Sequence, residues 1–369
     1  MTILDALIIG GGPAGTVTAR WLASAGLAVA VAERAAYETA RIGESLPPAA
    51  RPLLAEAGML DAFLAQGHEP SYQTRSAWGG PELAERDFIQ SPYGSGWHLD
   101  RRRFDALLAR TAAAAGARLL LEMEPVDLLR DRCGWRVTLC GPAGTATLRA
   151  RFLVDATGRA ATIGRRLGAR RELHDRLVGA AVRLRRGPAG DLYGASTLVE
   201  ATADGWWYSA PLPDGEQVAV FMTDGDLCRR VGGSTPAGWF AQLHAARHTF
   251  RRVAAARPLG PPRVWPAISQ RLLYAPNGDW LPVGDAALAF DPLSSDGICF
   301  ALRSARAAAA AVSAALAGDS TAPAAYAAAN AQEFAAYLRT RAAHYALETR
   351  WPEQSFWRRR RHLDEAPRR

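Results

Sequence analysis

The chain contains no lysine. All 44 basic residues among its 369 residues are arginine. An enzyme that forms a Schiff base with a lysine amine, or that binds nucleotide phosphates with a P-loop lysine, is therefore excluded. A lysine acting as general acid is excluded for the same reason.

Cysteine is also scarce. The four cysteines are Cys133, Cys140, Cys228 and Cys299, and no two of them form a CxxC pair. This spacing suggests neither a disulfide framework nor a zinc site, so we expect no metal centre. Unpaired cysteines fit a reducing compartment, and we expect a cytoplasmic protein.

Signals for export and for membrane insertion are missing. The first nine residues include Asp5 and no basic residue, which is not typical of a signal peptide. The apolar run at 307–318, AAAAAVSAALAG, is too short and too rich in alanine to span a bilayer. We therefore expect a soluble protein with no membrane contact.

The net charge of +8 does not indicate a nucleic-acid-binding protein, because the arginines are scattered. Their one dense run, WRRRRH at 357–362, lies near the end of the chain. A solvated tail, or a contact with an acidic partner protein, is the better interpretation of that run.

The strongest motif lies at the N-terminus. The sequence LDALIIGGGPAGTVTARWLASAGLAVAVAER predicts a strand, a glycine turn, a helix and a second strand. Gly10, Gly12 and Gly15 form GxGxxG, which permits close approach of the backbone to a pyrophosphate at the start of a helix. Glu33 ends the second strand, where its carboxylate accepts hydrogen bonds from ribose hydroxyls and repels a 2′-phosphate. The motif predicts a site for FAD or NAD.

Later segments select between these two dinucleotides. Three strand-like runs precede the buried strand FLVDATG (152–158), and a further apolar strand ends on Gly284-Asp285. A meander followed by a returning strand is not a dehydrogenase pattern.

Six motifs together resemble the FAD-dependent monooxygenases of the aromatic hydroxylase fold. The resemblance is greatest to the branch that contains flavin-dependent halogenases and LodB/GoxB-like flavoproteins. The motifs are GxGxxG with Glu33, RIGESLPP (41–48), HLDRRRFDALL (98–108), DATG (155–158), GD (284–285) and DPLSSDGI (291–298). They occur in the order found in that family, from the start of the chain to about residue 310.

This resemblance implies an α/β fold. We expect a glutathione-reductase-like FAD-binding domain of Rossmann type, an inserted substrate domain made of an antiparallel β-sheet, and C-terminal helices. FAD-binding segments are expected at 1–75, 97–172 and 266–318. Substrate-domain segments are expected at 76–96 and 173–265, and a helical region with a basic tail at 319–369.

The resemblance also implies which residues bind FAD. Arg41, Glu44 and Ser45 would lie along the flavin edge, Val126 would offer its backbone to the adenine, and Asp285 would accept from the ribityl chain. A surface ion pair is the alternative role for Arg41 and Arg101, and Arg102 and Arg103 compete with Arg101. The full expected set is Gly10, Gly12, Gly15, Glu33, Arg34, Arg41, Glu44, Ser45, Arg101, Val126, Asp285, Pro292, Ser295, Gly297 and Ile298.

The segment DPLSSDGI is expected to place a helix start against the flavin ring. Free backbone N–H groups near 295–298 would stabilise negative charge on reduced flavin. Relatives usually have Gly-x-Gly where this chain has Ser295-Asp296-Gly297. Asp296 is accordingly a candidate proton donor or base, and an acid that points to solvent from the first turn is the alternative.

Two departures argue against halogenation. The halogenases of this branch use a lysine after the GESL segment, and this chain has none. Their Trp-x-Trp-x-Ile-Pro motif is matched only in part, by Trp206, Tyr208, Ala210 and Pro211. The chain also has a single nucleotide fingerprint, so electrons are expected from a transient visit of NAD(P)H or from a separate flavin reductase.

The substrate sheet is predicted from alternating residues at 197–223, broken by Asp204-Gly205 and Asp214-Gly215. A period of two places Trp206 and Tyr208 on one face and Trp207 on the other. One face should pack on the core and the other should line the cavity. Either Trp206 or Trp207 is thus a candidate stacking wall for an aromatic substrate.

The expected catalytic set is Asp296, Trp207 and His68, while Tyr72 and His98 are further titratable candidates. Each of these side chains has a purely structural alternative: core filling for the tryptophans and a satisfied structural histidine for His68 and His98.

The resemblance implies hydroxylation of an electron-rich aromatic ring through a C4a-hydroperoxyflavin, with O2 as co-substrate. The substrate is an aromatic small molecule or a Trp in a partner protein that is converted towards a quinone cofactor. Two alternatives remain open. One is an FAD-dependent reductase of isoprenoid double bonds, similar to geranylgeranyl reductases. The other is a non-catalytic, flavin-stabilised protein that binds a partner through its basic tail.

Overall fold

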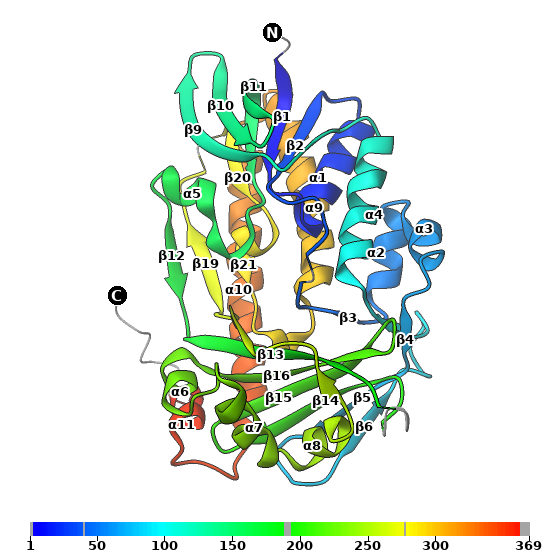
Figure 1. Cartoon of the computed structure of the whole chain (residues 1–369). Coiled ribbons are helices and arrows are strands. Elements are labelled where there is room, and N and C mark those ends of the chain that lie inside the picture. Colours follow the sequence, from blue (N-terminus) through cyan, green and yellow to red (C-terminus); the bar gives the residue numbers. More distant parts are fainter. Residues whose placement is uncertain (1–2, 40, 188–192, 277, 362–369) are drawn as a thin grey trace.

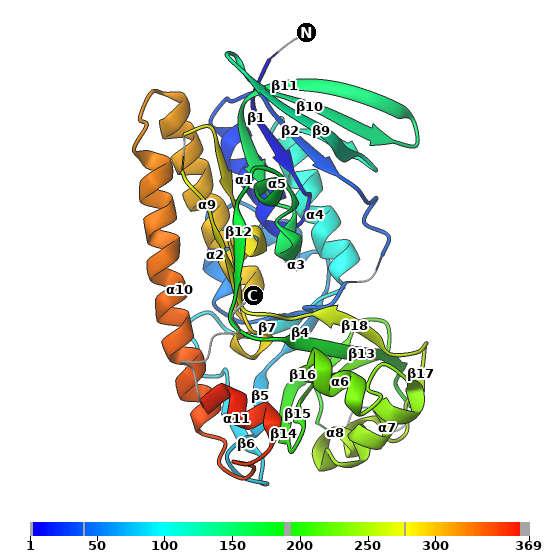
Figure 2. The ribbon, with the colours of Figure 1, turned by 90° about the vertical axis from the view of Figure 1, so that its left-hand side faces the viewer.

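The computed structural model describes residues 3–39, 41–187, 193–276 and 278–361. Two large sheets lie one above the other in Figure 1, and helix α10 runs beside both of them. Figure 2 shows α10 along one edge of the molecule, with the upper sheet at one of its ends and the lower sheet towards the other.

The upper sheet is built around the N-terminal strand. Its order is β8-β2-β1-β11-β10-β9, and β20 pairs with β11 on a separate branch. The pairs β8–β2, β2–β1, β1–β11 and β11–β20 are parallel, whereas β9, β10 and β11 form an antiparallel meander. The strands are β1 (Leu4–Ile9), β2 (Val29–Glu33), β8 (Arg118–Leu121), β9 (Glu124–Asp131), β10 (Gly134–Gly141), β11 (Gly144–Asp155) and β20 (Trp280–Pro282).

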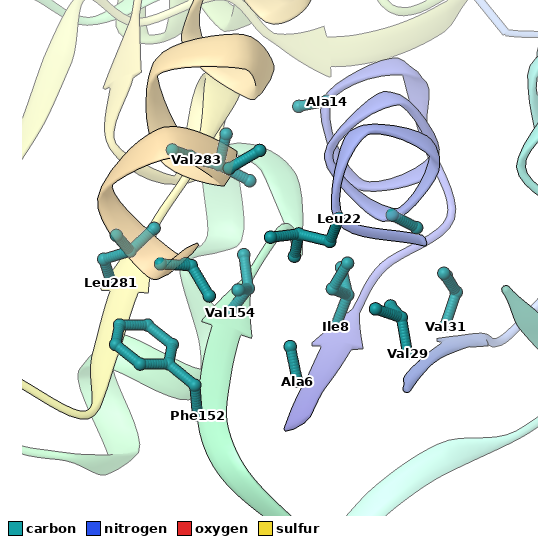
Figure 3. Packing of buried hydrophobic residues seen from close by; sticks show 14 of the residues in the cluster. Ala6, Ile8, Ala14, Leu22, Val29, Val31, Phe152, Val154, Leu281 and Val283 are labelled. Carbon is teal, nitrogen blue, oxygen red and sulfur yellow. The ribbon is translucent and has the colours of Figure 1, made fainter. Parts of the chain in front are cut away.

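The central parallel strands are apolar because helices cover them. Ile8, Val154 and Leu281 come from three neighbouring strands and pack with Leu22 of α1 (Pro13–Ser24), as Figure 3 shows. Burying each large aliphatic side chain of this kind stabilises the fold by about 2 kcal/mol. Near-continuous apolar runs such as LDALII are typical of parallel strands covered on both faces.

Helix α9 (Gly297–Leu316) packs beside α1 in the same core. It begins ten residues before the apolar run at 307–318, which by itself is too short to span a bilayer. The length and composition of the whole helix would allow it to cross one. Of the most apolar stretch of 18 residues in this helix, 56% is buried inside the protein, as in the core helix of a soluble protein. This helix is therefore weak evidence for a membrane.

The lower sheet has the order β17-β13-β16-β15-β14-β5-β6, with β18 paired to β13. It is antiparallel except for the parallel pair β14–β5. Both predicted hairpins are present, because Thr202 pairs with Gly205 and Leu212 pairs with Glu216. The strands are β5 (Gln73–Ala77), β6 (Ala84–Asp87), β13 (Leu177–Arg185), β14 (Ser196–Thr202), β15 (Gly205–Leu212), β16 (Glu216–Asp224), β17 (Arg257–Pro258) and β18 (Arg263–Pro266).

Shorter elements connect the two sheets. Two small sheets have the orders β3-β7-β4 and β12-β19-β21. Their strands are β3 (Ser45–Leu46), β4 (Glu69–Ser71), β7 (Gly96–His98), β12 (Arg170–Leu173), β19 (Gln270–Leu273) and β21 (Leu288–Ala289). The helices are α2 (Ala50–Glu56), α3 (Leu60–Leu64), α4 (Arg101–Ala114), α5 (Thr162–Arg166), α6 (Gly225–Arg230), α7 (Pro236–His244), α8 (Arg247–Val253), α10 (Ala322–Ala346) and α11 (Ser355–Arg361), with 3₁₀ turns η1 (Gly158–Ala160), η2 (Gly284–Ala286) and η3 (Pro292–Ser294).

Helix α10 contacts both parts of the molecule rather than the lower sheet alone. The Tyr326 hydroxyl, in its first half, donates to Pro282 O at the end of β20 (3.0 Å). Tyr345, near its end, lies in the core beneath the lower sheet with Trp206 and Trp357. The flavin-side and substrate-side elements thus share one long helix.

The predicted fold class is confirmed by this architecture and by the structural neighbours reported below. One detail differs from expectation, since β11 is both the last strand of the meander and the strand that returns beside β1. The five boundaries between the six expected segments remain predictions. Strand β5, which begins at Gln73, crosses the first of them.

Candidate FAD site and substrate side

The first part of the site is the start of α1. Gly10 has φ +109°, and a Cβ at this position would lie 2.2 Å from Ala156 O. Gly12 is the N-cap of α1, with no side-chain cap and no acid in the first turn. The first amides of the helix are therefore left for a phosphate ligand, as a dinucleotide site requires.

Glu33 is held beside this turn. Its Oε2 accepts a hydrogen bond from Gly11 N (2.6 Å), and its Oε1 lies 3.3 Å from Arg41. The Tyr37 hydroxyl donates to Gly11 O (2.8 Å), and this ring is buried. Glu33 thus lies at the end of β2, where a ribose acceptor was expected.

Two of the expected arginines share one carboxylate. Arg41 lies 3.4 Å from Asp105 Oδ2, and Arg101 Nε lies 3.0 Å from Asp105 Oδ1. Arg101 also donates to Ile42 O (2.9 Å), at the start of the flavin-edge segment. Asp105 was missed in the sequence, although it lies four residues after Arg101 on the helix that the DR pair begins.

The flavin-edge segment continues through Glu44. This carboxyl is buried, and burial raises its pKa, while Gly43 N and the nearby Arg101 and Arg183 lower it in part. A polar cavity lies here between the start of α4 and the lower sheet. Its lining includes Arg41, Glu44, Arg101, Arg102, Arg183 and Glu216.

The third part is the segment 284–298. A Cβ at Gly284 would lie 2.5 Å from Ala14 Cβ, so this segment touches the start of α1 directly. Asp285 pairs with Arg159 (3.3 Å) and remains partly accessible. Pieces of chain far apart in sequence therefore meet around one region, as the motif analysis predicted.

The amides near the helix start are only partly available. Ser295 N donates to Pro292 O (3.0 Å) and Asp296 N donates to Ser294 Oγ (3.3 Å). The amides of Gly297 and Ile298 begin α9, whose N-cap residue makes no side-chain cap. The expected charge-stabilising amides are therefore those of 297 and 298 rather than 295–298.

The Asp296 carboxylate forms a two-point ion pair with Arg303 (3.0 and 2.8 Å) on the exposed side of α9. An ion pair of this geometry occupies the carboxylate, which favours the solvent-facing alternative over a role as proton donor or base.

Trp207 is also misplaced as a cavity wall. It is 0% exposed, its ring stacks on Phe221, and its edge contacts Trp239 of α7. The opposite face of β15 carries Trp206 and Ala210, packed with Ile42 and Leu293 of the flavin-side loops. The face of β15 that packs against the flavin-side loops is therefore that of Trp206 and Tyr208. The Trp206 ring is itself only 1% exposed, and it packs with Tyr345 and Trp357.

His68 has a structural role as well. Its Nδ1 accepts from Asp100 N (3.2 Å), and its ring contacts Phe63 and Phe104. Burial lowers the pKa of His68 to about 4, so the ring is neutral near pH 7. It fixes the residue that caps α4. The other named candidate, Tyr72, is 57% exposed at the start of β5.

The remaining cofactor residues stay predictions. Arg34 is exposed directly after Glu33, and Val126 is 55% exposed on β9. Pro292 and Ser295 are exposed in the loop before α9, and Gly297 is exposed as the first residue of that helix. Ser45 lies on β3, facing the lower sheet. The glycine turn at the start of α1, the Glu33 carboxylate and the arginines Arg41 and Arg101 together fit an FAD molecule.

Comparison with known proteins decides the family. The family model described as "FAD binding domain" matches residues 4–336. The chain belongs to this FAD-binding family. It is an FAD-dependent oxidoreductase of the halogenase and hydroxylase group.

Two relatives match over most of the chain. LodB of Marinomonas mediterranea, described as an FAD-dependent oxidoreductase, is 30% identical over 98% of this chain and 97% of its own. Menaquinone reductase of Mycobacterium tuberculosis is 30% identical over 83% of this chain and 75% of its own.

Two solved structures are similar throughout. The myxobacterial chondrochloren halogenase CndH has a TM-score of 0.90 and 25% identity, covering 98% of this chain and 86% of its own. QhpG, a peptidyl tryptophan dihydroxylase essential for tryptophylquinone cofactor biogenesis, has a TM-score of 0.75 and 26% identity. It covers 97% of this chain and 79% of its own.

Proposed function

We propose that this flavoprotein is a monooxygenase that hydroxylates an electron-rich aromatic ring, the indole of a Trp in a partner protein. The observation that carries the proposal is its likeness to a peptidyl tryptophan dihydroxylase over 97% of the chain. The absence of lysine from a chain of halogenase fold supports it further.

The proposed reaction replaces a ring C–H bond with C–OH. One oxygen atom of O2 enters the product and the other leaves as water, with two electrons and two protons supplied by the donor. FAD supplies the oxygen activation when it is bound. The donor is NAD(P)H visiting transiently or a separate flavin reductase.

In this proposal, the residues of this chain bind FAD and orient the substrate ring beside it. The α1 start and Glu33 hold the dinucleotide, and Gly297 and Ile298 direct amides to the flavin region. The sheet face of Trp206 and Tyr208 lies opposite the flavin-side loops, where it positions the ring and excludes water.

The test is an incubation of the FAD-loaded protein with a co-purifying partner, an electron donor and isotopically labelled dioxygen. The expected result is a mass gain of one or two labelled oxygen atoms on a Trp of the partner. Free indole, assayed in parallel, distinguishes a small-molecule substrate. Turnover of the donor with no oxygen on either Trp or indole would contradict the proposal.

A reductase of isoprenoid double bonds is the second candidate, favoured by the similarity to menaquinone reductase. Such an enzyme needs an apolar channel that reaches the flavin. An apolar groove of about 370 Å³ exists, but Trp21, Leu53 and Leu302 line it, and its lining includes no residue of the lower sheet. Reduction of menaquinone without oxygen consumption would favour this candidate.

Partner binding through a free basic tail is not supported for the described part of that tail. Arg359 pairs with Asp226 (2.7 Å), Arg360 pairs with Asp224 (2.9 Å), and Arg361 donates to Glu348 O (2.8 Å). These arginines attach α11 to the lower sheet and to the end of α10. Residues 362–369 lie outside the described residues.

A further inference from the structure

Four polar side chains form a continuous hydrogen-bonded chain between the flavin-edge segment and the lower sheet. The Tyr208 hydroxyl lies 2.9 Å from Ser45 Oγ, and Ser45 Oγ lies 3.1 Å from Thr197 Oγ1. Thr197 Oγ1 lies 3.1 Å from His98 Nε2. The small sheet supplies Ser45 and His98, on β3 and β7, and the lower sheet supplies the other two residues.

The tautomer of His98 sets the direction of this chain. His98 is 0% exposed, and its Nδ1 has no partner among the described residues. An orphaned buried N–H is rarer in proteins than an orphaned acceptor. The hydrogen therefore lies on Nε2, which donates to Thr197 Oγ1 and leaves Nδ1 as a bare acceptor.

The hydroxyl hydrogens follow from that choice. Thr197 donates to Ser45, and Ser45 donates to the Tyr208 oxygen, so each of these hydrogens has an acceptor. If the hydroxyls were reversed while the hydrogen stayed on Nε2, Thr197 would accept from both His98 and Ser45, and its own hydrogen would be unpaired in a residue that is only 6% exposed. Tyr208 as a residue is half-buried, whereas Thr197 is buried, so the free hydrogen belongs at the Tyr208 end of the hydrogen-bonded chain.

Tyr208 lies on the face of β15 that packs against the flavin-side loops. Tyr208 packs on the same cluster as Trp206 and Ala210, together with Ile42 and Leu293 from the flavin-side loops. Ser45, its hydrogen-bond partner, is expected at the flavin edge and is also partly accessible. The opposite face of β15 is sealed by α7.

We propose that Tyr208 presents a fixed hydrogen-bond donor to an oxygen atom on the aromatic substrate, and that His98 is the positioning residue that fixes its direction. This inference rests on the proposed function for its catalytic meaning. It names the substrate class of the same site as a ring that carries an acceptor oxygen, such as a ring already hydroxylated once.

The surroundings hold Tyr208 and His98, the two ends of the hydrogen-bonded chain, in the protonation states that the proposal requires. Burial raises the pKa of Tyr208, with Glu44 raising it further, whereas the Ser45 hydrogen bond and Arg252 lower it, so the phenol stays protonated. Burial lowers the pKa of His98 to about 3, with Arg252 and Arg186 acting in the same direction, so the ring stays neutral.

The direction of the chain is tested by nitrogen NMR of the FAD-loaded protein labelled at histidine. The signals of His98 are assigned by their loss in His98→Gln. We expect a protonated Nε2 and an unprotonated Nδ1. A protonated Nδ1 would reverse the chain and overturn the proposal. This measurement needs no turnover, so it is independent of the proposed function.

The donor itself is tested by binding two probes to the FAD-loaded protein, followed through the flavin spectrum. Oxindole carries a ring carbonyl, and indole does not. Tyr208→Phe is expected to weaken oxindole binding about tenfold and to leave indole unchanged, because one hydrogen bond is lost. The matched control Tyr72→Phe removes an exposed hydroxyl and should change neither.

Three outcomes would overturn the donor assignment. They are equal weakening of both probes, unchanged oxindole binding in Tyr208→Phe, and a wild-type protein that binds neither probe. Failure of oxygenation with retained probe selectivity would instead contradict only the proposed function.

Discussion

Arg341 Nε lies 3.2 Å from Asp291 Oδ2, which joins α10 to the loop that precedes α9. The same guanidinium lies 2.9 Å from Asp175, and the Tyr345 hydroxyl donates to Asp291 (2.8 Å). Arg341 is 6% exposed, and Asp291 is 1% exposed. The loop that is expected to face the flavin is therefore fixed by α10.

Replacing Arg341 tests this link. Arg341→Met leaves two buried carboxylates without their cation, which is expected to lower the free energy of unfolding by about 3 kcal/mol or more. Urea unfolding is the measurement. Arg339→Met, on an exposed position of the same helix, is the control and should change stability by no more than about 0.5 kcal/mol. Equal losses in both variants would contradict the buried link.

Replacing Gly10 tests whether the glycine turn at the start of α1 binds FAD. Gly10→Ala combines a φ of +109° with a Cβ 2.2 Å from Ala156 O, so the turn must shift. We expect at least tenfold weaker FAD binding, measured as flavin retained after gel filtration and by titration. Gly26→Ala has φ +83° and open space around its Cβ, so it costs about 1 kcal/mol of stability and retains FAD. Full FAD retention in Gly10→Ala would place the cofactor elsewhere.

The lowered pKa of His98 predicts that the stability of the protein depends on pH. Its folded-state pKa is lowered from 6.5 to about 3, so between these values the unfolded chain binds a proton that the folded protein does not. The free energy of unfolding therefore falls as the pH drops from about 6.5 towards 3, by about 2 kcal/mol at about pH 5 from this residue.

The variant His98→Gln should flatten that slope by the same amount, measured by urea unfolding at a series of pH values. His244→Gln, at an exposed position, should leave the slope unchanged. A slope that is the same in wild type and His98→Gln would show that the folded protein accepts the proton at this site.

Halide chemistry gives a further prediction. Supplied with FAD, an electron donor, O2, bromide and indole, the protein should form no brominated indole, because the chain has no lysine amine to hold an oxidised halide. Mass spectrometry of the products is the measurement, and a flavin-dependent halogenase assayed in parallel is the positive control. Brominated product would show that lysine is dispensable in this fold.

The sequence predicted those parts of the site that depend on local backbone geometry. A glycine turn between a strand and a helix follows from the conformations that only glycine adopts easily, and Gly10 has such a conformation. The hairpin at Asp214-Gly215 follows from the preference of Asp-Gly pairs for turns with two positive φ values, which here are +63° and +70°. Period-two alternation correctly separated the faces of β15, although it gave no indication of which face is the outer one.

The sequence did not reveal which partners the candidate catalytic side chains have. Asp296 and His68 have residue types suited to acid–base chemistry, but Arg303 and Asp100 occupy their polar atoms. Trp207 was assigned to the cavity because both faces of an alternating strand look alike until another element covers one of them.

By itself, the sequence determined the FAD-binding fold, the dinucleotide turn and the exclusion of lysine chemistry, because these depend on which residues are present and on near neighbours along the chain. Only the tertiary structure joined Arg341 to Asp291 and His98 to Tyr208 through Thr197 and Ser45. Such contacts depend on how two sheets and a long helix pack, and a hydrogen bond or ion pair between residues more than 40 positions apart leaves no periodic signal in one sequence.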